Sequence, residues 1–185
     1  MSSSTLIRWG GLAAMLSSVP WIAYTLLYLT ALLTPLLVYV LVLVAVLLTL
    51  VGLAGLHALQ KGRYGFIGRV GFYTLFVAYM VQILSIVVFF LTESEVFFRW
   101  LLWIGYVGLL VGFVLFGAAT GRAGVLPRWC GDMLIIAFPV TIILAPYGDV
   151  VYGLVWLVLG YILWSRRGEA GERPTHARAR QTAGS

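Results

Sequence analysis

The chain has 185 residues, of which 62% are hydrophobic and 10% are charged. Soluble domains are about 45–50% apolar and about 25% charged, and a small soluble domain buries only about 70% of the surface its unfolded chain exposes. This composition excludes a soluble globular domain and predicts an integral membrane protein. The net charge of +6 is attributed to basic residues flanking membrane spans, not to nucleic-acid binding. One cysteine and two histidines argue against a disulfide, a metal site or a bis-histidine haem, so we expect no cofactor.

Six apolar segments follow one another along the chain, at about residues 9–33, 35–59, 66–91, 96–120, 127–145 and 150–164. A helix needs about 20 residues to cross the hydrocarbon, which the first four segments exceed and the last two barely reach. A re-entrant hairpin over residues 132–164 is the alternative for those two, but the apolar, uncharged 150–164 favours two spans. We therefore predict an all-α, polytopic transmembrane bundle of six helices over residues 1–165. Asp149 is expected to be the N-cap of the sixth helix.

The basic residues are distributed unequally between the alternate loops. With six spans and a cytoplasmic N-terminus, Arg99 is the one basic residue on the outer side of the membrane. Eleven basic residues lie on the inner side: Arg8, Lys61, Arg63, Arg69, Arg122, Arg128, Arg166, Arg167, Arg173, Arg178 and Arg180. The positive-inside rule then predicts a plasma-membrane protein with both termini cytoplasmic. The first segment is too long for a signal-peptide core, so we expect it to remain as a span. Residues 166–185 are rich in Arg, Ala, Gly and Glu, which predicts a disordered basic tail.

Two predicted inner loops share a pattern when the sequence is shifted by 59 positions. Residues 62–69 (GRYGFIGR) align with residues 121–128 (GRAGVLPR). The second and third helices could therefore be repeated, in parallel, as the fourth and fifth; chance convergence of short basic loops is the alternative. The arginines in these loops could hold lipid-headgroup phosphates or serve as ordinary topology determinants. They are Arg63, Arg69, Arg122 and Arg128.

Uncharged polar and aromatic side chains lie in the predicted outer half of the bundle. Gln82 is deepest, and Tyr79 and Ser85 share its helix face because they are three residues away on either side. Counting from the helix ends places further polar side chains at similar depth: Tyr24, Tyr28, Tyr106, Thr141 and Tyr152. We expect these eight residues either to line a polar and aromatic cavity that opens outward and binds a ligand, or to form hydrogen bonds between helices.

Ionisable residues inside the spans are scarce, which limits the possible chemistry. Asp132 is the one acidic residue that we place beside an apolar run, where it could pair with Arg128 one turn away. His57 lies near the inner end of the second helix. The chain has no G-x-S-x-G, H-E-x-x-H, Walker or G-x-G-x-x-G motif, so we assign no catalytic residue. An intramembrane enzyme using His57 and Asp132 is the weakest of three functional hypotheses.

Residues 55–65 (GLHALQKGRYG) and 122–129 (RAGVLPRW) resemble loops of small multi-pass bacterial membrane proteins of uncharacterised activity. The resemblance implies a bacterial plasma membrane and no particular activity. Our leading hypothesis is a protein that binds a lipid-like molecule or a membrane-protein partner, which includes a second copy of itself. The first alternative is a small transporter, or permease subunit, for a neutral or hydrophobic solute.

Overall fold

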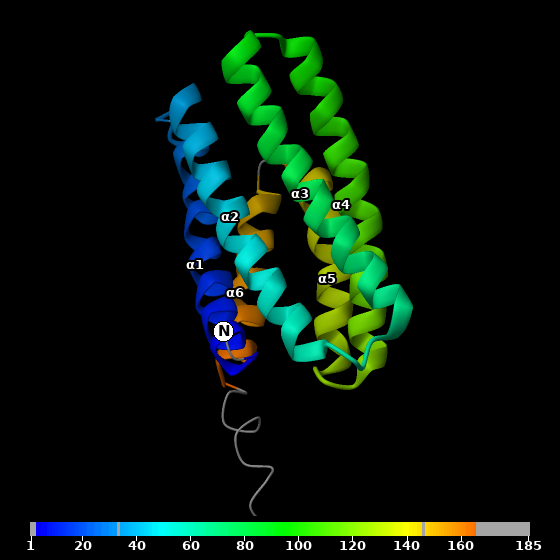
Figure 1. The fold of residues 1–185 in the computed structure, drawn as a ribbon. Coiled ribbons are helices and arrows are strands. Elements are labelled where there is room, and N and C mark those ends of the chain that lie inside the picture. Colours follow the sequence, from blue (N-terminus) through cyan, green and yellow to red (C-terminus); the bar gives the residue numbers. More distant parts are fainter. Residues whose placement is uncertain (1–2, 33, 146, 166–185) are drawn as a thin grey trace, which may run out of the picture.

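The computed structural model describes residues 3–32, 34–145 and 147–165, and within them it is entirely helical (Figure 1). Six helices follow in order: α1 (Ser3–Leu29), α2 (Pro35–Gln60), α3 (Gly65–Thr92), α4 (Glu95–Ala123), α5 (Arg128–Ile143) and α6 (Gly148–Ser165). The all-α fold is as predicted. The predicted tail, 166–185, lies outside the described residues, as does position 33, the predicted end of the first segment.

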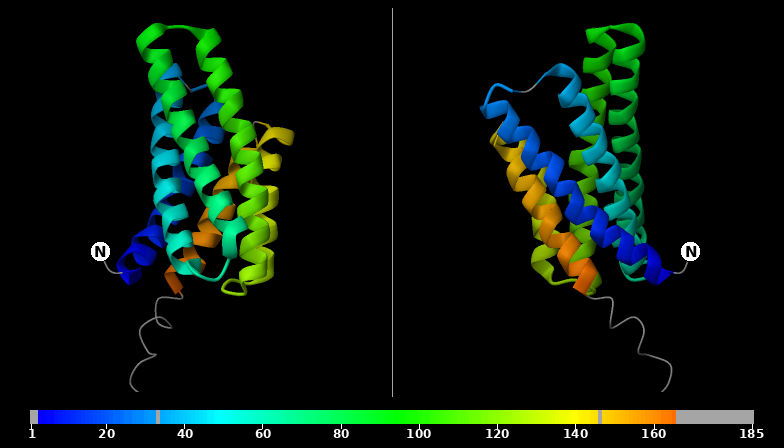
Figure 2. Two further views of the ribbon diagram at one scale, coloured as in Figure 1. Left: turned by 45° about the vertical axis from the view of Figure 1, so that its right-hand side comes forward. Right: turned by 90° about the vertical axis from the view of Figure 1, so that its left-hand side faces the viewer.

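Five of the helices are long and apolar enough to cross a membrane, and α5 is the exception. At 1.5 Å per residue, the 16 residues of α5 span about 24 Å, against a hydrocarbon core of about 30 Å. The expected fifth span of 127–145 is therefore too long by three residues, because the helix begins at Arg128 and ends at Ile143. Figure 2 shows the longer α3–α4 hairpin rising above the α1–α2 link.

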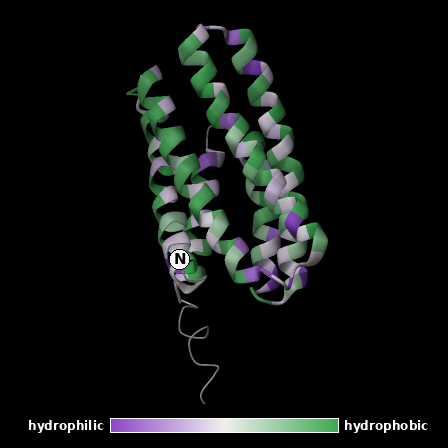
Figure 3. Ribbon diagram, viewed as in Figure 1, coloured by the Kyte–Doolittle hydropathy of each residue, from purple (hydrophilic) through white to green (hydrophobic). Residues whose placement is uncertain are grey.

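The outer surface of the bundle is apolar. Figure 3 shows hydrophobic ribbon along most of every helix, with hydrophilic positions gathered near the helix ends. Large apolar side chains point outward, including Val19 at 62% exposure and Leu91 at 79%. A soluble monomer rarely exposes contiguous apolar surface of this extent. The surface therefore indicates that the protein lies in a membrane.

The helices form a ring that is weak at one seam. α1 packs between α2 and α6, α4 packs between α3 and α5, and α5 contacts α6 (Figures 1 and 2). In contrast, α2 and α3 contact each other little although they are consecutive. Aromatic rings bridge this seam near both ends: Tyr39 lies beside Phe89, with ring centroids 5.3 Å apart, and His57 stacks on Phe72 at 4.0 Å.

Small residues explain the close helix pairs. A Cβ atom added to Gly10 would lie 2.5 Å from Gly55 Cα, and one added to Gly117 would lie 2.7 Å from Gly131 O. Backbones at such distances leave no room for a side chain, as is common where helices pack inside membranes. These contacts join α1 to α2 and α4 to α5.

The predicted repeat can be compared with this packing. In the 59-residue shift, Gly117 and Gly131 correspond to Ala58 and Phe72, so the second glycine of the pair that joins α4 to α5 is replaced by a bulky residue on α3. The two helix pairs consequently pack differently. What the loops share is one left-handed glycine, with φ of 65° at Gly65 and 64° at Gly124.

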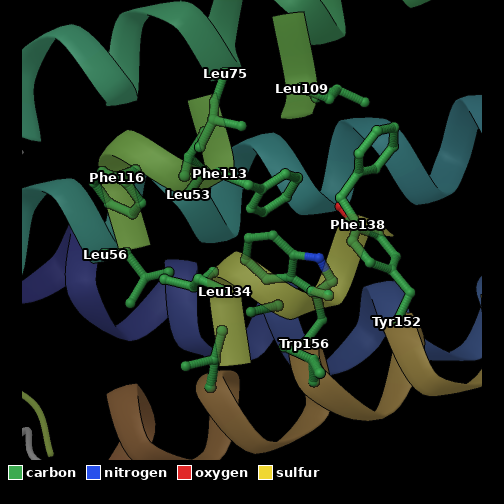
Figure 4. Close-up of a cluster of buried hydrophobic side chains, with 14 of the residues drawn as sticks. Leu53, Leu56, Leu75, Leu109, Phe113, Phe116, Leu134, Phe138, Tyr152 and Trp156 are labelled. Carbon is green, nitrogen blue, oxygen red and sulfur yellow. The ribbon is translucent and has the colours of Figure 1, made fainter. Parts of the chain in front are cut away.

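The centre of the bundle is filled by apolar side chains contributed by all six helices. Figure 4 shows Phe113 and Trp156 surrounded by leucines, with Phe138 and Tyr152 at one edge of the cluster. Phe113 and Trp156 are fully buried. This packed cluster closes one end of the space described next.

Candidate ligand-binding cavity

A cavity of about 640 Å³ lies among the six helices, in the half of the bundle that carries the α1–α2, α3–α4 and α5–α6 links. Cavities that hold small molecules measure about 300–1,000 Å³. Two of its lining residues, Tyr28 and Trp103, are 53% and 61% exposed, so the cavity reaches the molecular surface. Of its 21 lining residues ten are aromatic: Trp21, Tyr24, Tyr28, Tyr39, Tyr79, Phe98, Trp103, Tyr106, Phe138 and Tyr152.

All eight residues proposed from helical depth line this one cavity. α1 contributes Tyr24 and Tyr28; α3 contributes Tyr79, Gln82 and Ser85; α4, α5 and α6 contribute Tyr106, Thr141 and Tyr152. Those on α3 and α4 stand further from the helix ends than those on α1, α5 and α6, because the α3–α4 hairpin rises above the α1–α2 link. The structure therefore brings together the whole predicted set, and their role in binding a ligand stays a prediction.

The hydrogen bonds of these polar side chains are of two kinds, between helices and within one helix. The Tyr79 and Tyr152 hydroxyls bond to each other across the bundle, from α3 to α6. Ser85 and Thr141 donate to carbonyls one turn earlier on their own helices, at 2.7 Å each. Hydrogen bonding between helices thus accounts for one pair of the eight.

The Gln82 side chain makes neither kind of hydrogen bond with a described residue. Gln82 is 8% exposed. Its backbone carbonyl accepts a hydrogen bond from the Ser85 hydroxyl, but no hydrogen bond joins its side-chain amide to any described residue. Buried polar groups in proteins are nearly always hydrogen-bonded. A buried amide at the wall of a cavity is therefore available to a ligand.

One charged residue of the cavity, Asp149, was not among the predicted site residues. Asp149 was expected to be the N-cap of α6, which is wrong. Asp132 was expected to be the only acid beside an apolar run, and Asp149 is a second one. α6 begins at Gly148, so Asp149 is in its first turn and lines the cavity. Helix α6 starts two residues earlier than predicted, at Gly148, which packs against the backbone of Thr141. The sequence position of Asp149 carries no signal that separates it from Glu93, Glu95 and Asp132, which also stand near helix ends and are exposed.

The four loop arginines are solvent-exposed at the opposite end of the bundle from the cavity. Arg69 lies in the first turn of α3, Arg122 in the last turn of α4 and Arg128 at the start of α5, while Arg63 precedes α3. No ion pair with another described residue engages them, and the expected pair of Arg128 with Asp132 is not formed. The lipid-phosphate role stays a prediction.

His57 and Asp132 are not joined in the structure. The His57 ring contacts Phe72, and its Nδ1 is hydrogen-bonded to the Tyr64 hydroxyl. Burial raises the pKa of Tyr64, which lies between α2 and α3, so its hydroxyl keeps its proton. Asp132 is exposed on α5 and makes no hydrogen bond or ion pair with a described residue. This arrangement gives the His57–Asp132 enzyme hypothesis no support.

A second hollow, of about 460 Å³, lies along α3 and α4. It is walled mainly by aliphatic residues such as Val70, Val77 and Ile104, with no charged side chain. Its polar side chains are those of Tyr73 and Thr74, whereas the cavity among the six helices has a carboxylate, an amide and several hydroxyls and is the better candidate site. Within the described residues, no three His, Cys, Asp or Glu side chains gather where they could hold a metal.

Comparison with protein families, curated proteins and solved structures found no match to this chain.

Proposed function

We propose that this protein is an integral membrane protein that binds a small, largely apolar, lipid-like molecule in the cavity among its six helices. The observation that carries the proposal is the cavity itself, whose volume of about 640 Å³ lies within the range of known small-molecule sites. Its walls are mostly aromatic and aliphatic, which favours an apolar ligand body. A few polar groups such as Gln82 would fix the ligand's orientation.

The charge distribution supports an orientation for the site. Among the described residues, Arg99 lies at the cavity end of the bundle, where it pairs with Glu95 at 3.5 Å. The other six basic residues lie toward the opposite end: Arg8, Lys61, Arg63, Arg69, Arg122 and Arg128. By the positive-inside rule, we place both termini in the cytoplasm and the cavity toward the outer face of a plasma membrane.

The test uses an uncharged apolar probe, para-hexyl-tert-butylbenzene, and protein reconstituted in lipid nanodiscs. Thr141→Trp places a large ring in the cavity, while Val107→Trp adds the same ring to the outer surface of α4, where Val107 is 60% exposed. Probe retained above the level of empty nanodiscs is measured by equilibrium dialysis.

We expect Thr141→Trp to weaken probe binding at least about fivefold, which is about 1 kcal/mol, and Val107→Trp to bind as the wild type does. Size-exclusion profiles establish that both variants fold. Equal binding by all three proteins, or no binding by the wild type, would contradict the proposal.

A further inference from the structure

One acidic side chain lines the cavity, and nothing in the described structure neutralises it. Asp149 is half-buried, and none of the lining residues is Lys, Arg or His. Its carboxylate makes no ion pair or hydrogen bond with a described residue, so it does not cap α6. It lies close enough to Tyr24, Tyr106 and Tyr152 to interact electrostatically with them. Charged groups inside membrane proteins are costly and generally have a functional partner.

The surroundings of Asp149 are aromatic. Tyr152 lies one turn further along α6, and its ring meets the Trp21 ring edge-on at 5.2 Å. Across the cavity Tyr106 contacts both Trp103 and Phe138, with centroids 6.1 and 5.7 Å apart. The faces of such rings attract cations, and Trp is the most effective.

One carboxylate among aromatic rings favours an organic ammonium ion over a metal cation. Ca²⁺ requires six to eight oxygen ligands and Mg²⁺ requires a nearly ideal octahedron, whereas this cavity offers one carboxylate, one amide and hydroxyls. A quaternary or protonated ammonium needs no such shell, since aromatic faces and one counter-charge suffice.

We infer that the cavity's ligand is an amphiphilic organic cation, with an ammonium group placed against Asp149 and an apolar body among the aromatic side chains. This inference depends on the proposed function, because it names the class of molecule that the same cavity binds. Gln82, on the α3 wall, would orient a polar group elsewhere on that ligand.

The experiment compares two probes of equal shape. Para-hexylphenyltrimethylammonium carries a cation, and para-hexyl-tert-butylbenzene has carbon in place of the charged nitrogen. Each is titrated by equilibrium dialysis into nanodiscs containing the wild type, Asp149→Asn or Asp132→Asn. Asp132→Asn is the matched control, because it removes an equal charge from the exposed side of α5. Nanodiscs without protein give the partitioning background.

We expect Asp149→Asn to weaken binding of the ammonium probe at least about tenfold and to change binding of the uncharged probe less than twofold. Asp132→Asn should bind both probes as the wild type does, and Asp149→Glu, which keeps the charge, should restore most of the ammonium binding if Asp149→Asn folds poorly.

Two results would overturn the inference. If Asp149→Asn binds the ammonium probe unchanged, or loses both probes equally, the cation assignment fails while the cavity proposal survives through the uncharged probe. If neither probe binds the wild type above background, the proposed function fails as well.

Discussion

The tight contact between α1 and α2 allows a prediction with a magnitude. A Cβ atom added to Gly10 would meet Gly55 Cα at 2.5 Å and Val51 O at 3.1 Å, whereas carbon atoms pack at about 3.5–4.0 Å. α1 would therefore have to move away from α2 by about 1 Å. It cannot do so freely, because Gly11 on the same helix lies against α6, where a Cβ would stand 3.1 Å from Gly160 O.

Gly10→Ala should consequently destabilise the protein. Overpacking costs about 1–3 kcal/mol, and the better helix propensity of alanine returns up to about 1 kcal/mol, so we expect a net loss of about 1–2 kcal/mol. Gly121→Ala is the matched control, since the nearest atom to its added Cβ is Arg128 O at 3.7 Å. This control should be neutral or slightly stabilising.

The assay is reversible unfolding by sodium dodecyl sulfate in mixed micelles, followed by circular dichroism. If the two alanine variants unfold at the same detergent fraction, the packing of α1 against α2 is not as described and the reasoning is refuted.

Two further predictions concern the Tyr79–Tyr152 hydrogen bond and the membrane topology. Tyr79→Phe removes the hydroxyl pair with Tyr152 and should cost about 0.6 kcal/mol, the average for hydrogen bonds between helices in membranes, in the same unfolding assay; a loss above about 2 kcal/mol would show that the pair does more than join α3 to α6. In a Cys130→Ala background, Ser94→Cys should react with an impermeant maleimide added outside intact cells and Ser165→Cys should not; the reverse pattern would invert the proposed orientation.

Much of the fold could be predicted from the lengths of the apolar segments. Each apolar segment long enough to span the hydrocarbon became a helix, and Thr34 with Pro35 marked the start of α2, where the Thr34 side chain accepts from Leu37 N. The positions of the eight polar and aromatic residues were predictable because 1.5 Å per residue converts sequence distance into depth. Depth is a one-dimensional quantity, and here it sufficed to collect residues from five helices.

Lateral arrangement could not be predicted in the same way. Short links specify which helices are consecutive, yet α1 packs against α6 and α2 hardly contacts α3. The difference depends on which small residues face each other, as Gly10 and Gly55 do. A single sequence shows where glycines are and not which partner they meet.

The aromatic residues show a second limit. Trp103 is 61% exposed, as a ring of an interfacial aromatic belt would be, and it also lines the cavity. Tyr39 and Phe98 carried no distinguishing signal in the sequence, although both line the cavity and contact each other, with ring centroids 6.2 Å apart. A ring at the end of a span satisfies both roles, so composition does not separate them.

The most direct measurement of the central claim is native mass spectrometry of the protein released from nanodiscs made with its host's lipids. The account predicts an additional mass at one copy per chain in the wild type, retained by Val107→Trp and lost from Thr141→Trp. An unliganded mass for the wild type, or the same additional mass in all three proteins, would contradict the assignment of the cavity as a ligand site.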